Sequence, residues 1–163
     1  MVRWGLIGGS DIAATRMIPA MRAIGQTPVA VSSSSAQRAE LFADRHDIAS
    51  SCRDVDDLLA RDDVDAVYIS SVNRLHAEHT IAAAAAGKHV MCEKPVALDV
   101  ADAADMVAAC ERAGVVFAVN HHLPAHTANT SSGRSSLPAP SARSSRSVRS
   151  SPTNWLPGCM VGD

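Results

Sequence analysis

Short apolar segments alternate with longer amphipathic segments over residues 1–122. The apolar segments are continuous rather than alternating, which is typical of strands buried on both faces of a sheet. They predict strands over residues 4–7, 28–31, 66–69, 89–92 and 115–119. Helices are predicted between them, over residues 11–24, 36–45, 55–61, 76–86 and 100–113. These strand–helix–strand repeats predict a Rossmann-type α/β fold, a doubly wound parallel sheet with helices on both faces.

Several ends of the predicted helices carry residues that start or stop helices. Asp99 is a suitable N-cap for the helix that follows it, and Gly87 and Gly114 come directly after two predicted helices. Pro19 is the one local objection to the pattern, because a proline inside a helix lacks the N–H group that the helix needs.

The sequence changes character after His122. From residue 131 to residue 151, ten of 21 residues are serine and four are arginine, and no Asp or Glu occurs between Glu111 and Asp163. Such a composition is not expected to fold alone. We therefore predict one domain over residues 1–122 and an irregular or disordered tail over residues 123–163. The tail is either a natural flexible, basic segment or the product of a reading-frame slip in GC-rich DNA, which tends to encode Ser, Arg, Pro and Ala in a displaced frame.

The overall composition narrows the classes of partner. Hydrophobic residues make up 47% of the chain and aromatic residues only 3%, so the core must consist of small aliphatic side chains, which suit helix-on-sheet packing. The formal net charge is −2 and the pI about 6.4, which gives no electrostatic reason to expect nucleic acid as a partner.

The cysteines and the N-terminus bear on the compartment. The four cysteines form no Cys-x-x-Cys pair, which argues against a zinc site and favours reduced thiols in the cytoplasm. The first residues run directly into an apolar strand and lack the pattern of a signal peptide. The run Ala82–Ala86 is too short to cross a bilayer. We expect a cytoplasmic protein without a metal site and without a membrane partner.

A glycine-rich turn, G-L-I-G-G-S-D-I-A over residues 5–13, joins the first strand to the first helix. Gly8 permits the tight turn, and Gly9 lets a pyrophosphate approach backbone N–H groups at the start of the helix. Ser10 and Ala13 occupy the positions of the second and third fingerprint glycines, and the Ser10 hydroxyl can donate to phosphate. Because a lone degenerate glycine motif is weak, an ordinary strand-to-helix turn is the alternative.

The end of the second strand is rich in hydroxyl groups and ends in Arg38. NAD-binding domains usually place Asp or Glu here, on the ribose 2′-hydroxyl, but the first acid in this chain is Glu40, already inside the helix. Ser33, Ser34 and the Arg38 guanidinium instead suit a 2′-phosphate. This pattern predicts NADP rather than NAD, with a polar loop and a solvated arginine as the alternative.

Polar residues also follow the strands at 66–69 and 89–92. Asn73 can hydrogen-bond the nicotinamide side of a cofactor, whereas His76 either lies near it or only holds the start of the helix. Lys94 is expected to face the crevice, where its ammonium group could polarise a substrate carbonyl and pass a proton. Glu93 could pair with Lys94 or contact a ribose. The alternative is a surface salt bridge at a strand end.

The last predicted strand ends in Asn120-His121-His122. Asn120 is placed to meet the nicotinamide ribose or the substrate. Neighbouring residues on a strand point to opposite faces, so the two histidines are not expected to bind one metal ion.

Together these segments resemble the Gfo/Idh/MocA oxidoreductase family over residues 1 to about 122. The match lies in G-L-I-G-G-S-D-I-A, D-A-V-Y-I-S-S-V-N-R-L-H-A-E-H, A-G-K-H-V-M-C-E-K-P and G-V-V-F-A-V-N-H-H, and E-K-P with its preceding A-G-K-H-V is the highly specific part. The resemblance implies NADP-dependent hydride transfer to a sugar or polyol carbonyl, with Lys94 as the catalytic lysine. It also implies a second α/β domain, which is not recognisable here. With the turn glycine included, the candidate cofactor-binding residues are Gly8, Gly9, Ser10, Asp11, Ile12, Ser33, Ser34, Arg38, Ser71, Val72, Asn73, Arg74, Leu75, His76, Glu93, Lys94 and Asn120.

Three functional hypotheses follow from the sequence. The first is a sugar or polyol reductase, truncated so that mainly nucleotide binding is left. The second is a stand-alone NADP-binding or regulatory module without catalysis. The third, supported only by four arginines among serines, is an interaction protein whose tail contacts acidic surfaces.

Overall fold

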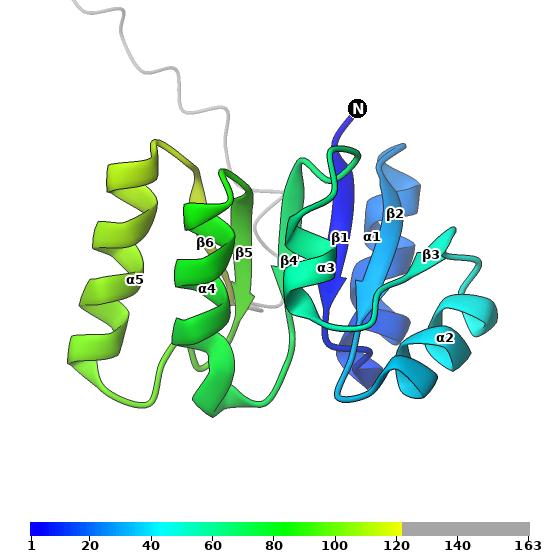
Figure 1. Ribbon diagram of the computed structural model, residues 1–163, viewed down its shortest axis with the longest axis horizontal. Coiled ribbons are helices and arrows are strands. Elements are labelled where there is room, and N and C mark those ends of the chain that lie inside the picture. The colour runs from blue at the N-terminus through cyan, green and yellow to red at the C-terminus, as the bar shows by residue number, and fades with distance from the viewer. Residues whose placement is uncertain (122–163) are drawn as a thin grey trace, which may run out of the picture. The chain divides into compact units, whose positions relative to one another are not determined.

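The computed structural model describes residues 1–121, which form a six-stranded parallel sheet with the strand order β3-β2-β1-β4-β5-β6 (Figure 1). All five strand pairs are parallel. The order reverses between β1 and β4, which is the doubly wound arrangement that the sequence predicts. The strands are β1 (Arg3–Ile7), β2 (Thr27–Ser32), β3 (Ser50–Ser51), β4 (Ala66–Ile69), β5 (His89–Glu93) and β6 (Phe117–Asn120).

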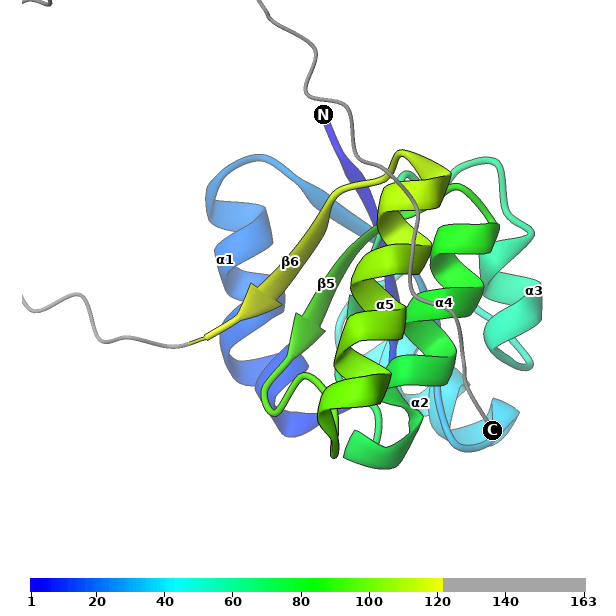
Figure 2. The ribbon, with the colours of Figure 1, turned by 90° about the vertical axis from the view of Figure 1, so that its left-hand side faces the viewer.

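Helices cover both faces of the sheet, with α1 on one side and α3, α4 and α5 on the other (Figure 2). The side of α1 and α2 encloses a cluster that includes Leu6 and Tyr68, and the opposite side encloses one that includes Ile7 and Val67. Successive residues of a buried strand point to opposite faces, so each strand supplies both cores. The helices are η1 (Ala13–Met17), α1 (Ile18–Ala23), α2 (Ala36–Arg45), α3 (Val55–Leu59), η2 (Asn73–Leu75), α4 (His76–Ala85) and α5 (Val100–Ala113).

The region around Pro19 keeps its helical path but changes its hydrogen bonding. Residues 11–23 are helical throughout, and the stretch Ala13–Met17 just before the proline is a π-helix. A π segment shifts the hydrogen-bond register, which accommodates a residue that has no N–H to donate. The predicted helix is therefore present and ends at Ala23, with a local irregularity just before Pro19.

Several other helix ends agree with the local signals, whereas the last strand covers Phe117–Asn120 and not the predicted residues 115–119. Ser35, Asp54 and Asp99 each cap a helix by accepting a hydrogen bond from a backbone N–H three residues on. Gly114 ends α5 in the left-handed conformation. The short strand β3 was missed, because a two-residue edge strand of two serines carries no apolar signal.

Some sequence predictions concern residues outside the described part of the chain. These are His122, Cys159 and the tail over residues 123–163, whose boundary and character stay predictions. Within residues 1–121, Cys52, Cys92 and Cys110 are buried free thiols, and burial raises the pKa of Cys92 to about 12. In that same part of the chain, no helix combines the length and the apolar character needed to cross a membrane. Nor does a group of three metal-ligating side chains occur there.

Candidate functional site

The candidate residues gather at one edge of the sheet, because all six strands are parallel and their carboxyl ends meet there. The loop after β1 carries Gly8 and Gly9, the loop after β2 carries Ser33 and Ser34, and residues after β4, β5 and β6 complete the edge. Ligands of doubly wound sheets bind at this edge, next to the point where the strand order reverses.

Gly8 is held where only glycine fits. Its φ angle is +107°, and a Cβ atom there would lie 2.7 Å from the backbone N of Ser71 and 2.8 Å from the carbonyl carbon of Ser70. Its own N–H donates to the carbonyl oxygen of Ser32 at 2.9 Å. The turn is thus wedged between the ends of β2 and β4, and its backbone is exposed to a ligand, as a pyrophosphate-binding turn requires.

A chain of hydroxyl groups fixes this turn. Ser10 Oγ donates to Ser70 Oγ at 2.7 Å, and Ser70 Oγ donates to the carbonyl oxygen of Gly8 at 3.0 Å. Ser10 Oγ also accepts from the N–H of Ala13 at 3.2 Å, as an N-cap does. Sequence analysis left out this role of Ser70. Donation from Ser10 to a phosphate stays a prediction, because its proton is directed at Ser70.

Two adjoining cavities lie along the turn. One of 240 Å³ is lined by Gly8, Gly9, Ser10, Ser33, Ser34, Arg38, Ser70, Ser71 and Val72. A smaller one of 160 Å³ is lined by Ile7, Gly8, Ser32, Ser33, Ser34, Val55, Ser71, Val72, Leu75 and His79. The structure therefore brings the glycine turn, the serine-rich loop, Arg38 and the start of the loop after β4 into one continuous region.

His79 is a residue that sequence analysis missed. It lies one helical turn beyond Leu75, so the two side chains share a face of the helix and line the same cavity. Its Nδ1 atom is 3.0 Å from Ser71 Oγ, and burial lowers the pKa of His79. The ring is therefore neutral near pH 7 and offers a flat wall to an uncharged ligand group. The four-residue spacing from Leu75 is the signal that could have found it.

His76 is enclosed rather than presented to a ligand. Its side chain is 1% exposed, with Nδ1 2.9 Å from the carbonyl oxygen of Pro95 and Nε2 3.1 Å from that of Ser71. The ring therefore ties the loop after β4 to the loop after β5. This geometry fits the interpretation of His76 as a residue that holds the loop, while the cofactor contact that the family resemblance implies stays a prediction.

Glu93 forms the centre of a buried polar cluster. Its Oε1 accepts from the hydroxyl of Tyr68 and, at 2.7 Å, from Nδ2 of Asn120, while Oε2 accepts from the backbone N–H of Lys94 at 3.2 Å. Glu93 is 6% exposed, and Tyr68 is fully buried. Burial and the hydrogen bond to Glu93 raise the pKa of Tyr68 far above its usual value. The cluster fixes Asn120, in register with Glu93, beside the backbone of Lys94.

Residues 2–121 match the family model described as the oxidoreductase family with an NAD-binding Rossmann fold, GFO_IDH_MocA. The chain belongs to the Gfo/Idh/MocA oxidoreductase family. The match confirms the family resemblance that the sequence motifs predict, and it ends where the described part of the chain ends.

Members of this family with known activities or structures are similar to the chain over the same domain. The 1,5-anhydro-D-fructose reductase of Ensifer adhaerens is 50% identical over 123 residues, which are 76% of this chain and 37% of the reductase. KijD10, a 3-ketoreductase from Actinomadura kijaniata solved with NADP and TDP-benzene, gives a TM-score of 0.69 at 38% identity, over 73% of this chain and 37% of that chain. A levoglucosan dehydrogenase solved with NADH and levoglucosan gives a TM-score of 0.66 at 29% identity, over 72% of this chain and 34% of that chain. The chain thus spans little more than a third of the length of these relatives.

Within this family domain, the predicted residues differ in how they are presented. Val72, Asn73, Arg74 and Lys94 have exposed side chains, and none of Asn73, Lys94 and Asn120 lines either of the two cavities described above. They lie at the same carboxyl edge, further along the sheet toward β5 and β6. The expected crevice shared by Gly8, Asn73, Lys94 and Asn120 stays a prediction.

Proposed function

We propose that this chain carries the NADP-binding part of an oxidoreductase that reduces the carbonyl group of a sugar or polyol, as 1,5-anhydro-D-fructose reductase does. The observation that carries the proposal is that two different groups of residues lie along the carboxyl edge of the sheet. A glycine turn with a cavity for nucleotide lies at the β1–β2 side, and an exposed lysine lies beside a fixed Glu93–Asn120 cluster at the β5–β6 side.

The residues fit a dinucleotide. The lack of a Cβ at Gly8 lets the turn pack against the backbone of Ser70 and Ser71, and the 240 Å³ cavity along residues 8–10 leaves room for a pyrophosphate. The 160 Å³ cavity, lined by Val55, Leu75 and the neutral His79, suits the flat adenine ring. Ser33, Ser34 and Arg38 then lie near the ribose, where hydroxyls and a guanidinium favour a 2′-phosphate over a free hydroxyl.

Relatives support the use of a nicotinamide cofactor without deciding which one. KijD10 was solved with NADP and the levoglucosan dehydrogenase with NADH. The choice therefore depends on this chain's own residues, and the absence of an acid before Glu40 together with Arg38 supports NADP.

Lys94 is the proposed catalytic residue. When bound, NADPH would supply the hydride to the carbonyl carbon of the substrate. The ammonium group of Lys94 donates a hydrogen bond to the carbonyl oxygen, stabilises the negative charge that develops there and passes it a proton, so that the product is the alcohol. The hydrogen bond from the Lys94 N–H to Glu93 fixes the backbone from which this side chain extends.

The test is NADPH oxidation by 1,5-anhydro-D-fructose, with cofactor binding measured in parallel. We expect Lys94→Ala to abolish turnover while the dissociation constant for NADPH changes less than about threefold, since the ammonium acts on the substrate. Lys94→Arg keeps the charge but changes the shape of the donor, so it should also leave NADPH binding unchanged and should not restore full turnover. A preference for NADH over NADPH would contradict the cofactor assignment.

A second candidate is an NADP-binding module without turnover. The observation that favours it is that the chain spans only about 37% of the length of these relatives. Tight NADPH binding with no oxidation by any sugar ketone, in the wild type as in Lys94→Ala, would support this candidate.

A further inference from the structure

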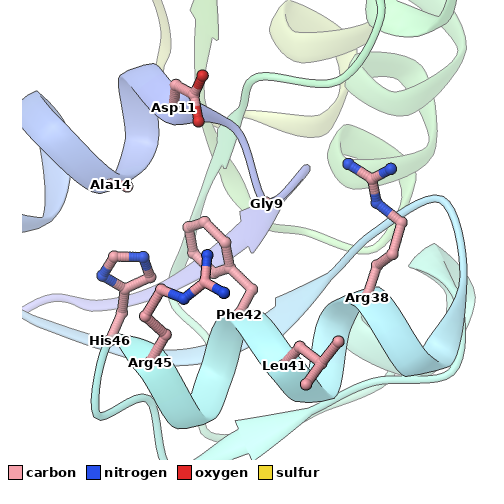
Figure 3. A pocket seen from close by; sticks show the side chains of 8 residues that line it. All are labelled: Gly9, Asp11, Ala14, Arg38, Leu41, Phe42, Arg45 and His46. Carbon is pink, nitrogen blue, oxygen red and sulfur yellow. The ribbon is translucent and has the colours of Figure 1, made fainter.

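A third cavity, of 380 Å³, lies between the first helical turn after the glycine loop and helix α2 (Figure 3). No sequence motif pointed to its far half, which is formed by the last turn of α2. It is lined by Gly9, Asp11, Ala14, Arg38, Leu41, Phe42, Arg45 and His46.

Helix α2 segregates its charges around this cavity. Arg38, Phe42 and Arg45 are spaced by four and three residues, so they share one face of the helix. The carboxylates of the same helix, Glu40 and Asp44, fall on the other side by the same count and do not line the cavity. Arg45 and Arg38 both extend upward from the helix toward the glycine loop (Figure 3).

The cations of the cavity are not neutralised within the molecule as described. Neither Arg38 nor Arg45 forms an ion pair with any of residues 1–121, whereas Arg3, Arg53 and Arg61 each do. The ring of His46 packs against that of Phe42 with centroids 4.5 Å apart, which keeps the imidazole at the wall.

Asp11, on the opposite wall, is the one carboxylate of the lining. Two guanidinium groups and an imidazole therefore face one acid, and the cavity attracts anions.

The position of the cavity indicates which anion it takes. It shares Gly9 and Arg38 with the 240 Å³ cavity along the glycine turn, so the two adjoin at those residues. In the proposed pose, with the pyrophosphate over residues 8–10 and the ribose at Ser33 and Ser34, Gly9 and Arg38 border the ribose, and we take its 2′ substituent to face this shared wall.

We propose that the cavity holds the 2′-phosphate of NADP, and that Arg45 and His46 act with Arg38 to determine the preference for NADP over NAD. This inference rests on the proposed function, in that the chain must bind a nucleotide at the glycine turn. A phosphate monoester offers three oxygens, enough for donors from more than one side, and an arginine can hold two of them at once. A free 2′-hydroxyl gains nothing from Arg45 or His46.

The experiment compares two probes that differ only in the 2′-phosphate. The dissociation constants of adenosine 2′,5′-bisphosphate and of 5′-AMP are measured by calorimetry on the full chain. We expect Arg45→Ala to weaken the bisphosphate about 10- to 100-fold, as the loss of a charge-assisted hydrogen bond does, and 5′-AMP less than about twofold. His46→Gln should weaken the bisphosphate by a smaller factor and leave 5′-AMP unchanged.

Two controls separate this inference from the proposed function. Arg112→Ala removes the same charge from an exposed position of α5, the helix that lies at the other end of the sheet from α2 (Figure 1), and should leave both dissociation constants unchanged. Arg38→Ala tests the 2′-phosphate assignment itself. If Arg38→Ala weakens the bisphosphate selectively and Arg45→Ala does not, the role of Arg45 is wrong while NADP binding stands. If the wild type binds both probes equally and Arg38→Ala changes neither, the NADP assignment fails, and this inference with it.

Discussion

The two ends of the functional sheet edge are built in opposite ways. At the β1–β2 end, the side chains of Ser33, Ser34 and Arg38 line cavities and make no hydrogen bond or ion pair within residues 1–121. At the β4–β6 end, Glu93 accepts from Tyr68 and Asn120, and His76 is enclosed between two carbonyl groups. Unpaired donors at the surface await a ligand, whereas buried polar groups with partners hold the fold. Substitutions at the first end should therefore change affinity, and substitutions at the second should change stability.

The largest effect is expected at Gly8, where the two ends touch. Gly8→Ala would place a Cβ at φ +107° and 2.7 Å from the backbone of Ser71, and backbone cannot rotate away as a side chain can. We expect a loss of about 4 kcal/mol or more in the free energy of unfolding, together with loss of nucleotide binding. Chemical denaturation of wild type and variant measures the first, and titration with NADPH the second.

Gly25→Ala is the matched control for that substitution. Gly25 also has a positive φ, +73°, but an added Cβ there would meet nothing within 4 Å. It should cost only the conformational strain, about 1–2 kcal/mol, and leave NADPH binding intact. Equal losses at the two glycines would show that the wedge between β2 and β4 is not what requires Gly8.

The next largest effect is expected at His76, the tie between the loops after β4 and β5. His76→Ala removes a buried ring and leaves the carbonyl groups of Ser71 and Pro95 without it, at a cost of about 3 kcal/mol. Thermal or denaturant unfolding measures this loss. His79→Ala, one turn along at a half-buried position, should cost less. If His76→Ala instead unfolds like wild type but binds NADPH poorly, His76 contacts the cofactor after all.

Tyr68→Phe should have a smaller effect, about 1–2 kcal/mol, because it removes one donor to Glu93 and keeps the buried ring. The pKa of Tyr68 is raised in the folded state above its ordinary value of about 10. The stabilisation from the phenol is therefore fully present below pH ~10 and declines as the pH rises further toward the folded pKa. Denaturation of the two proteins between pH 7 and pH 11 checks this, and a difference that grows above pH 10 would contradict it.

The fold and the β1–β2 end of the site were predictable from sequence because their signals are local. Continuous apolar strands give the parallel sheet, and the carboxyl ends of such strands must meet at one edge, which places Gly8, Ser33 and Arg38 near each other. The missing acid before Glu40 is likewise visible in the chain itself.

The contacts of the β4–β6 end were not predictable, because they join residues far apart in the chain. Tyr68 reads as an ordinary core residue until the register of β4, β5 and β6 places it beside Glu93. The burial of His76 depends on the path of the loop around Pro95, 19 residues away. Arg45 and His46 lacked a motif because their significance comes from a helix face that packs near the glycine loop.

The smallest effects on stability are expected at Arg38 and Arg45, and they should have opposite signs. Arg38 lies in the first turn of α2, where the helix dipole disfavours a cation, whereas Arg45 lies in the last turn, where the dipole favours one. Without ligand, Arg38→Gln should raise the free energy of unfolding by about 0.3–0.5 kcal/mol and Arg45→Gln should lower it by a similar amount, both at low salt. Both should weaken binding of the 2′-phosphate. Arg38 would then lower the stability of the free protein and raise its affinity for the 2′-phosphate, as expected of a ligand-binding residue. If Arg38→Gln destabilised the free protein, Arg38 would be a structural residue. The β1–β2 end would then hold the fold in the same way as the β4–β6 end.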